Sequence, residues 1–214
     1  MTCRYAVATL AVLTAATVVL PRDVIGLQTE QDRPVILAVG ESTTAGYGVP
    51  RELSYPSQLQ NALDARGYRY RVVNHGVSGS TTGAALTRLS RGMALLPKIV
   101  IIALGGNDAG SRVAGAATRA NLGKLISMFK RVGAEVFVAD RSLPGAGVVV
   151  AELAKEHHAV LMPPLLTGVT GHPDLLLGDG SHPNAAGYTV IVQNILQVIE
   201  PYLIKATASA SRSN

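Results

Sequence analysis

The sequence predicts an α/β fold in which helices cover both faces of a central parallel sheet. Two runs, residues 35–39 (VILAV) and 99–104 (IVIIAL), are apolar throughout and lack the polar alternation of a half-exposed strand. Segments with helical periodicity separate the strand-like runs along the chain. At 214 residues, 48% hydrophobic and 15% charged, the chain is long enough for one well-buried domain and too short for two.

The first half of the domain alternates strands with helices. Residues 35–39 form the first strand, and residues 55–66 carry two leucines at helical spacing between a serine N-cap and a terminating glycine. Residues 70–74 form the second strand and lead into a glycine-rich turn. We expect one helix over residues 82–96, with Gly92 as its weak point.

The second half continues the same alternation and ends in a polar tail. The helix expected at residues 117–131 places its large apolar side chains on one face, as a packed amphipathic helix does. The Ser/Ala-rich residues 205–214 are expected to be disordered. The remaining expected elements are the strands 99–104, 135–139 and 160–162 and the helices 148–157 and 184–199.

Composition excludes several classes of protein. The net charge is +5, but the basic residues are scattered, aromatics are only 4% and there is no Trp, which argues against nucleic-acid binding. Cys3 is the single cysteine, so the chain has no internal disulfide framework and no cysteine cluster for zinc.

The N-terminal residues predict export. Arg4 precedes the apolar residues 5–20, which would span roughly 24 Å as a helix, a length that suits a signal-peptide core. No clean cleavage site follows, so residues 1–28 are either a signal peptide or an uncleaved membrane anchor, and a buried first helix is the less favoured alternative. We expect a periplasmic, secreted or envelope-anchored protein, and N-terminal sequencing of the exported form distinguishes these cases.

A serine, a histidine and an aspartate lie where a parallel sheet places its ligand sites. Ser42 follows the first strand at the carboxyl edge and is a candidate nucleophile, although a turn cap is the simpler interpretation. A serine nucleophile needs an imidazole as base and a carboxylate to orient that imidazole. Asp179 and His182 supply both groups across a turn, which taken alone is also a common way to begin a helix.

An oxyanion needs hydrogen-bond donors that are fixed before the reaction. The backbone N–H groups of Ser42 and Gly79 and the side-chain amide of Asn107 would converge if all three loops lie on the carboxyl edge of the sheet. Taken singly, Gly79 and Asn107 are ordinary turn residues.

Four short blocks occur in order and span most of residues 35–188. Together they resemble the four signature blocks of the SGNH (GDSL-type) hydrolases, and their spacing is most similar to the bacterial thioesterase, arylesterase and lysophospholipase branch. The blocks are Gly40-Glu41-Ser42, the Gly79 block within residues 74–82, Gly105-Gly106-Asn107-Asp108, and Asp179-Gly180-Ser181-His182-Pro183-Asn184.

The resemblance implies a flavodoxin-like three-layer α/β/α sandwich over residues 34–204. It also implies a catalytic triad of Ser42 as nucleophile, His182 as base and Asp179 as orienting acid, with Ser42, Gly79 and Asn107 forming the oxyanion hole. Two features depart from the family pattern. Glu41 stands where the family has Asp, and residues 140–148 look shorter than in the similar branch, so an acyl-length preference does not carry over.

These observations predict a serine esterase that hydrolyses small acyl, aryl or lysophospholipid esters or thioesters through an acyl-enzyme, without a metal or cofactor. Membrane association would come from the N-terminal segment, and the oligomeric state is left open. The alternatives are a carbohydrate O-deacetylase of the cell envelope and a non-catalytic lipid-binding envelope protein with the same fold, which Glu41 alone favours. Five leucines could line an acyl groove or pack in the core: Leu165, Leu166, Leu175, Leu176 and Leu177.

Overall fold

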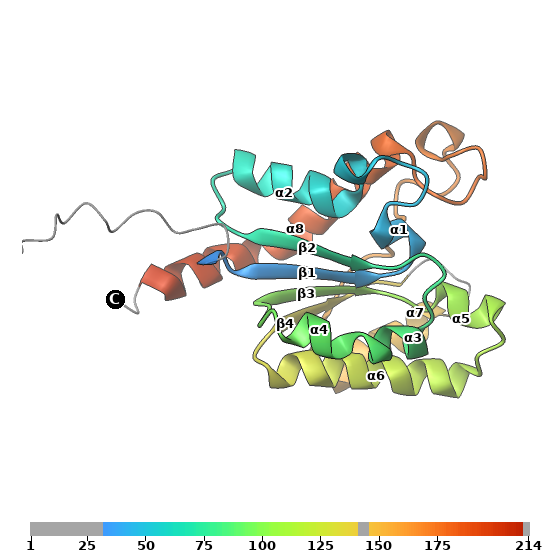
Figure 1. The fold of residues 1–214 in the computed structure, drawn as a ribbon, viewed down its shortest axis with the longest axis horizontal. Helices are drawn as coiled ribbons and strands as arrows, with labels where there is room; N and C mark the ends of the chain where they lie inside the picture. The colour runs from blue at the N-terminus through green and yellow to red at the C-terminus, as the bar shows by residue number, and fades with distance from the viewer. Residues whose placement is uncertain (1–31, 141–145, 212–214) are drawn as a thin grey trace, which may run out of the picture.

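The computed structural model describes residues 32–140 and 146–211 (Figure 1). The expected signal peptide or anchor, residues 1–28, lies outside the described residues, as do residues 141–145 of the segment expected to be short. Both expectations therefore stay predictions. Within the described part of the chain, no helix combines the length and the apolar character needed to cross a membrane.

Five parallel strands form one sheet in the order β2-β1-β3-β4-β5, which confirms the predicted α/β class. This is the strand order of flavodoxin-like folds. The register places Gly40 opposite both Gly76 and Ala103, so the loops that follow the first three strands leave the sheet side by side. The strands are β1 (Val35–Gly40), β2 (Arg71–Gly76), β3 (Ile99–Ala103), β4 (Glu135–Val138) and β5 (Val160–Leu161).

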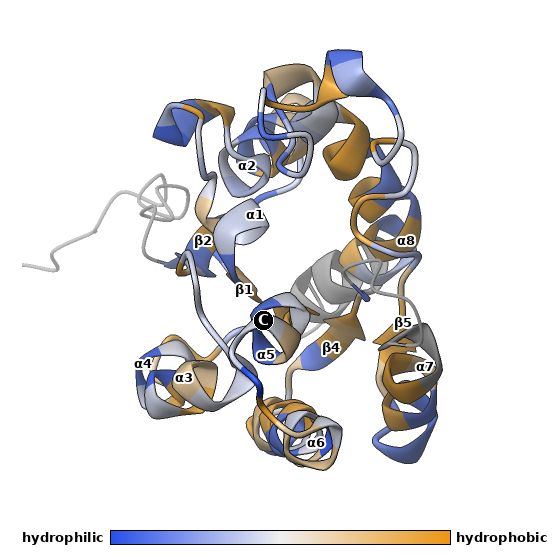
Figure 2. Ribbon diagram, turned by 90° about the vertical axis from the view of Figure 1, so that its right-hand side faces the viewer, coloured by the Kyte–Doolittle hydropathy of each residue, from blue (hydrophilic) through white to orange (hydrophobic). Residues whose placement is uncertain are grey.

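Helices cover both faces of the sheet, as the layers in Figure 2 show. Helices α2 (Tyr55–Ala65) and α8 (Ala185–Ser211) pack on one face. The opposite face carries α3 (Thr82–Thr87), α4 (Leu89–Met93), α6 (Gly115–Arg131) and α7 (Ala146–Glu156). Four short elements lie in the loops: α1 (Ser42–Ala45), α5 (Gly106–Gly110), and the 3-10 turns η3 (Arg51–Leu53) and η4 (Pro173–Leu175).

Strand β1 shows why a run of apolar residues without polar alternation predicts this fold. Ile36 and Ala38 of β1 point into the core shared with α2 and α8, whereas Leu37 and Val39 point into the core shared with α6 and α7. All six residues of β1 are buried. A strand buried on both faces has no position for a polar side chain, which accounts for the sequence pattern.

The single helix expected over residues 82–96 is two helices, and the expected weak point at Gly92 is wrong. The break lies at Arg88, which ends α3 and begins α4. The Arg88 guanidinium donates hydrogen bonds to the Ala84 carbonyl and the Ser80 hydroxyl, both 2.9 Å away. Gly92 lies inside α4, where a β-carbon would come within 2.9 Å of Leu37, so its small size permits close packing on the sheet.

Helix α8 continues past the expected end at Ile199. It contains Pro201 and reaches Ser211, into the segment for which we expected disorder. Tertiary packing holds the turn around the proline, because Leu203 is fully buried and the Tyr202 ring meets Phe137 edge-on with centroids 4.9 Å apart. Packing of this kind overrides the low helix propensity of proline.

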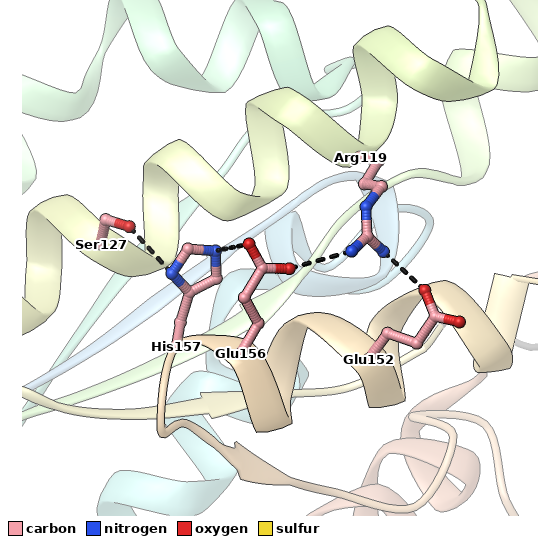
Figure 3. Close-up of polar contacts among 5 residues, drawn as sticks. All are labelled: Arg119, Ser127, Glu152, Glu156 and His157. Carbon is pink, nitrogen blue, oxygen red and sulfur yellow. Dashed lines mark hydrogen bonds and ion pairs between the residues drawn. The ribbon is translucent and has the colours of Figure 1, made fainter.

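Polar contacts join α6 to α7 on the outer face (Figure 3). Arg119 donates to Glu152 at 2.8 Å and to Glu156 at 2.9 Å. His157, which directly follows α7, shares a hydrogen bond with Ser127 of α6 at 3.1 Å and so belongs to the contact between the two helices. These contacts hold α7 against α6.

Candidate active site

Ser42 begins the short helix α1 directly after β1. It is 7% exposed, and the chain turns sharply between strand and helix. A β-carbon on Gly40 would lie 1.9 Å from the Thr44 hydroxyl, so the glycine that ends the strand permits this turn. The turn places the hydroxyl of Ser42 at the carboxyl edge of the sheet, as the sequence predicts.

His182 and Asp179 come from the loop between η4 and α8 and reach the same point. The Ser42 Oγ lies 2.9 Å from His182 Nε2, although the two residues are 140 positions apart in the sequence. His182 Nδ1 lies 2.7 Å from Asp179 Oδ2. The structure therefore brings the three predicted triad residues into one hydrogen-bonded chain.

Asp179 is held in its charged form. Its Oδ1 accepts the backbone N–H groups of His182 and Ser181, each at 2.9 Å, while its Oδ2 faces the imidazole. These hydrogen bonds, with the His182 N–H first, lower the pKa of Asp179 from 3.8 to about 2. A carboxylate accepts the Nδ1–H of the imidazole and leaves Nε2 free to accept the serine proton, which is the tautomer that a general base needs.

Tyr47 is a neighbour of His182 that the sequence interpretation missed. The two rings lie 4.5 Å apart between centroids, at 42° to each other. Tyr47 is 50% exposed, so it covers one side of the imidazole from the solvent edge. An aromatic residue between two glycines five positions after the candidate nucleophile was the available signal, because such a turn carries its side chain back over the site.

Asn107 connects the loops that carry the other candidate oxyanion donors. Its side-chain Nδ2 donates to Glu41 Oε2 and, at 3.2 Å, to the Ser80 carbonyl. Glu41 immediately precedes Ser42, and Ser80 immediately follows Gly79, whose φ of +77° suits glycine. The three predicted oxyanion residues thus lie in loops that one amide group joins.

Asp108 is a second structural link that the sequence interpretation missed. Its buried carboxylate accepts the Thr82 N–H at 2.9 Å, the Thr82 hydroxyl at 2.5 Å and the Thr118 hydroxyl at 3.2 Å. These bonds tie the loop after β2 to the loop after β3 and to α6. The residue next to Asn107 therefore fixes the loop that carries it.

Two hollows lie near these loops. One, of about 430 Å³, lies between the loop after β3 and helices α6 and α7 and is largely apolar; its lining includes Leu104, Gly105, Asp108, Val113, Leu122 and Val149. The other, of about 450 Å³, lies beside Asp179 and is lined by Leu176, Leu177 and neighbouring residues.

The five leucines considered for an acyl groove divide between two environments. Leu165 and Leu166 are buried in the core. Leu175 and Leu176 are partly buried against the same core. Of the five leucines, Leu176 and Leu177 border the hollow beside Asp179. Core packing therefore accounts for most of the set.

Comparisons with known proteins agree with this geometry. The model of the GDSL-like lipase/acylhydrolase family matches residues 38–190, which include all four signature blocks. The chain belongs to this family. It is thus an ester hydrolase of the SGNH (GDSL) type, with the fold that the sequence predicted.

Individual members of the GDSL family are similar over most of the chain. Arylesterase from Vibrio mimicus is 34% identical and esterase TesA from Pseudomonas aeruginosa is 32% identical, each over an alignment of 181 positions that covers 78% of this chain and 89% of the relative. A crystal structure of TesA superimposes with a TM-score of 0.74 at 31% identity, covering 78% of this chain and 98% of that one.

Proposed function

We propose that this GDSL-family hydrolase is a serine esterase that cleaves small carboxylic esters through an acyl-enzyme, with Ser42, His182 and Asp179 as its triad. The observation that carries the proposal is the continuous hydrogen-bonded chain from the Ser42 hydroxyl through both ring nitrogens of His182 to the carboxylate of Asp179. Glu41, the feature that favoured a non-catalytic protein, leaves this chain of contacts intact.

The reaction proceeds in two steps. Ser42 Oγ attacks the ester carbonyl carbon while His182 Nε2 takes the serine proton, and the C=O π electrons move onto the oxygen to form a tetrahedral oxyanion. As the oxyanion collapses, the bond to the alcohol breaks and His182 returns the proton to the departing oxygen. Water then attacks the acyl-enzyme with the same proton transfers and releases the acid. Asp179 keeps its negative charge beside the imidazolium throughout.

The test of the proposed function is hydrolysis of aryl esters together with covalent labelling by a serine-reactive phosphonate. We expect the purified protein to hydrolyse aryl esters and to lose activity in step with the incorporation of one phosphonate per chain. Folded protein that neither hydrolyses the esters nor takes up the probe would contradict the proposal and favour a binding protein.

Removing the Asn107 side chain tests the oxyanion hole. We propose that the N–H groups of Ser42 and Gly79 and the amide of Asn107 bind the oxyanion. We therefore expect Asn107→Ala to lower kcat by about 10² to 10³-fold with little change in KM, as the loss of one donor does in serine hydrolases. Steady-state kinetics on an aryl ester measures this, with the exposed Asn61→Ala on α2 as the matched control. Wild-type turnover in Asn107→Ala would remove this residue from the site.

The apolar hollow next to the loop that carries Asn107, which Gly105 and Asp108 help to line, supports a substrate with an acyl chain of several carbons. Its volume of about 430 Å³ is in the range of small-molecule pockets. Two carboxylates, Asp108 and Asp140, lie in its lining. The hydrogen bonds from Thr82 and Thr118 already satisfy Asp108, Asp140 is 9% exposed, and most of the other lining residues are apolar. We propose that this hollow takes the acyl group, which favours medium-chain esters over acetylated carbohydrate.

Narrowing the hollow tests this assignment. Val149→Phe adds a ring to its wall, and we expect kcat/KM for an octanoyl ester to fall by about 10-fold or more, whereas the value for the acetyl ester stays near wild type. A panel of aryl esters of increasing acyl length measures the effect. Leu161→Phe on the exposed edge of β5 is the control. An equal loss for all chain lengths would place the acyl group elsewhere.

A further inference from the structure

A buried carboxylate lies next to the candidate nucleophile. Glu41 occupies the turn between β1 and α1, is only 1% exposed, and does not use its side chain to cap its own helix. Instead, its Oε2 accepts the backbone N–H of Asn107 at 3.1 Å and the side-chain Nδ2–H of the same residue. A buried charge is tolerated only when hydrogen bonds compensate it, so these two contacts are needed for the stability of the turn.

The same contacts use up the donors of the Asn107 side chain. An asparagine amide has two N–H hydrogens. In the substrate-free enzyme, one is directed at Glu41 and the other at the Ser80 carbonyl, 3.2 Å away. For the amide to stabilise an oxyanion, one of these two bonds has to give way.

The two bonds differ in strength. A hydrogen bond to a carboxylate is roughly twice as strong as one to a neutral carbonyl, and breaking it would leave the buried charge of Glu41 with fewer donors. The contact with Ser80 is long and neutral. The substrate oxygen therefore competes for the Asn107 amide hydrogen that is directed at the Ser80 carbonyl, and not for the one directed at the Glu41 carboxylate.

We propose that Glu41 is a positioning residue for the oxyanion hole. It anchors Asn107 through the backbone and one amide hydrogen, so that the second amide hydrogen passes from the Ser80 carbonyl to the substrate oxygen as negative charge develops. This proposal rests on the proposed function, because it explains how Asn107 becomes available as a donor. Glu41 acts through Asn107 and makes no contact with the substrate.

A double-mutant cycle tests the proposal. Glu41→Gln keeps the length of the side chain but replaces the charged acceptor with a neutral one, which loosens the amide of Asn107. We expect kcat to fall about 10-fold, with KM near wild type, because small misplacements of a catalytic group cost one to two orders of magnitude. In the Asn107→Ala background, the same substitution should change kcat by less than about twofold, because its target is already missing.

Controls separate positioning from folding. Titration with the phosphonate probe counts competent active sites, so kcat is expressed per site and a loss of folded protein does not imitate a loss of turnover. Glu52→Gln, an exposed site in η3, is the matched control and should keep wild-type kcat. Failure of the wild type to react with the probe would contradict the proposed function itself.

Three results would overturn the positioning role while leaving the esterase proposal intact. In the first, Glu41→Gln keeps its kcat within twofold of wild type. In the second, the fold-loss in kcat caused by Glu41→Gln is the same in the Asn107→Ala background as in wild type, which would mean that Glu41 acts independently of the amide. In the third, kcat rises, which would mean that the charge of Glu41 mainly opposes the oxyanion.

Discussion

Replacing Ser42 by alanine is expected to lower kcat by about 10⁶-fold and to abolish labelling by the phosphonate probe. The magnitude follows from other serine hydrolases, in which loss of the nucleophile leaves only the rate enhancement from binding and the oxyanion hole. The fold should survive, because Ser42 contributes a small side chain at the edge of the sheet. The measurements are burst kinetics with an aryl ester and mass spectrometry of the labelled protein.

The control for this substitution is Ser90→Ala, an exposed serine in α4. It should retain full activity and take up one phosphonate on Ser42. A Ser42→Ala protein that still hydrolyses the ester or still carries the phosphonate would assign the nucleophile to another residue, and the triad described above would be wrong.

Replacing Asp179 by asparagine is expected to lower kcat by about 10⁴-fold. Asparagine can donate from its amide to the imidazole and so favours the tautomer with the proton on Nε2, which cannot accept the proton of Ser42. It also removes the negative charge that stabilises the imidazolium. Asp174→Asn, in η4 just before that loop, is the control and should stay close to wild type. Turnover within 10-fold of wild type in Asp179→Asn would contradict the role of this carboxylate.

The pH dependence of stability provides a second measurement on Asp179. Its pKa in the folded protein is lowered from 3.8 to about 2, so the charged form is favoured by folding. Its contribution to stability is fully present above pH 3.8 and is lost as the pH falls towards 2. The difference in the urea midpoint between wild type and Asp179→Asn should therefore shrink over this range.

The sequence and the structure differ most where contacts join distant loops. The sequence placed Ser42, Gly79 and Asn107 after the first three strands, and parallel pairing of those strands is enough to bring the three loops to one edge. It could not show that Asn107 already donates to Glu41 and Ser80. That depends on side-chain rotamers and on the exact approach of two loops 66 positions apart.

Two helix boundaries also depend on tertiary contacts that the sequence pattern does not show. Gly92 has a low helix propensity, but its small size matters for packing against Leu37, and the helix breaks at Arg88 instead. Pro201 should have ended the last helix, yet burial of Leu203 continues it. In both cases the energy of tertiary packing exceeds a local preference of about 1 to 3 kcal/mol.

The sequence by itself determined the α/β class, the positions of the five strands and the order of the four blocks, because apolar runs and turn residues act through local backbone preferences and burial. Only the tertiary structure decided that Tyr47 covers His182, that Glu41 binds Asn107, and that most of the candidate groove leucines pack in the core. Those contacts depend on how strands and loops far apart in the chain are placed in space. Local pattern carries no information about that placement until the sheet order and register are known.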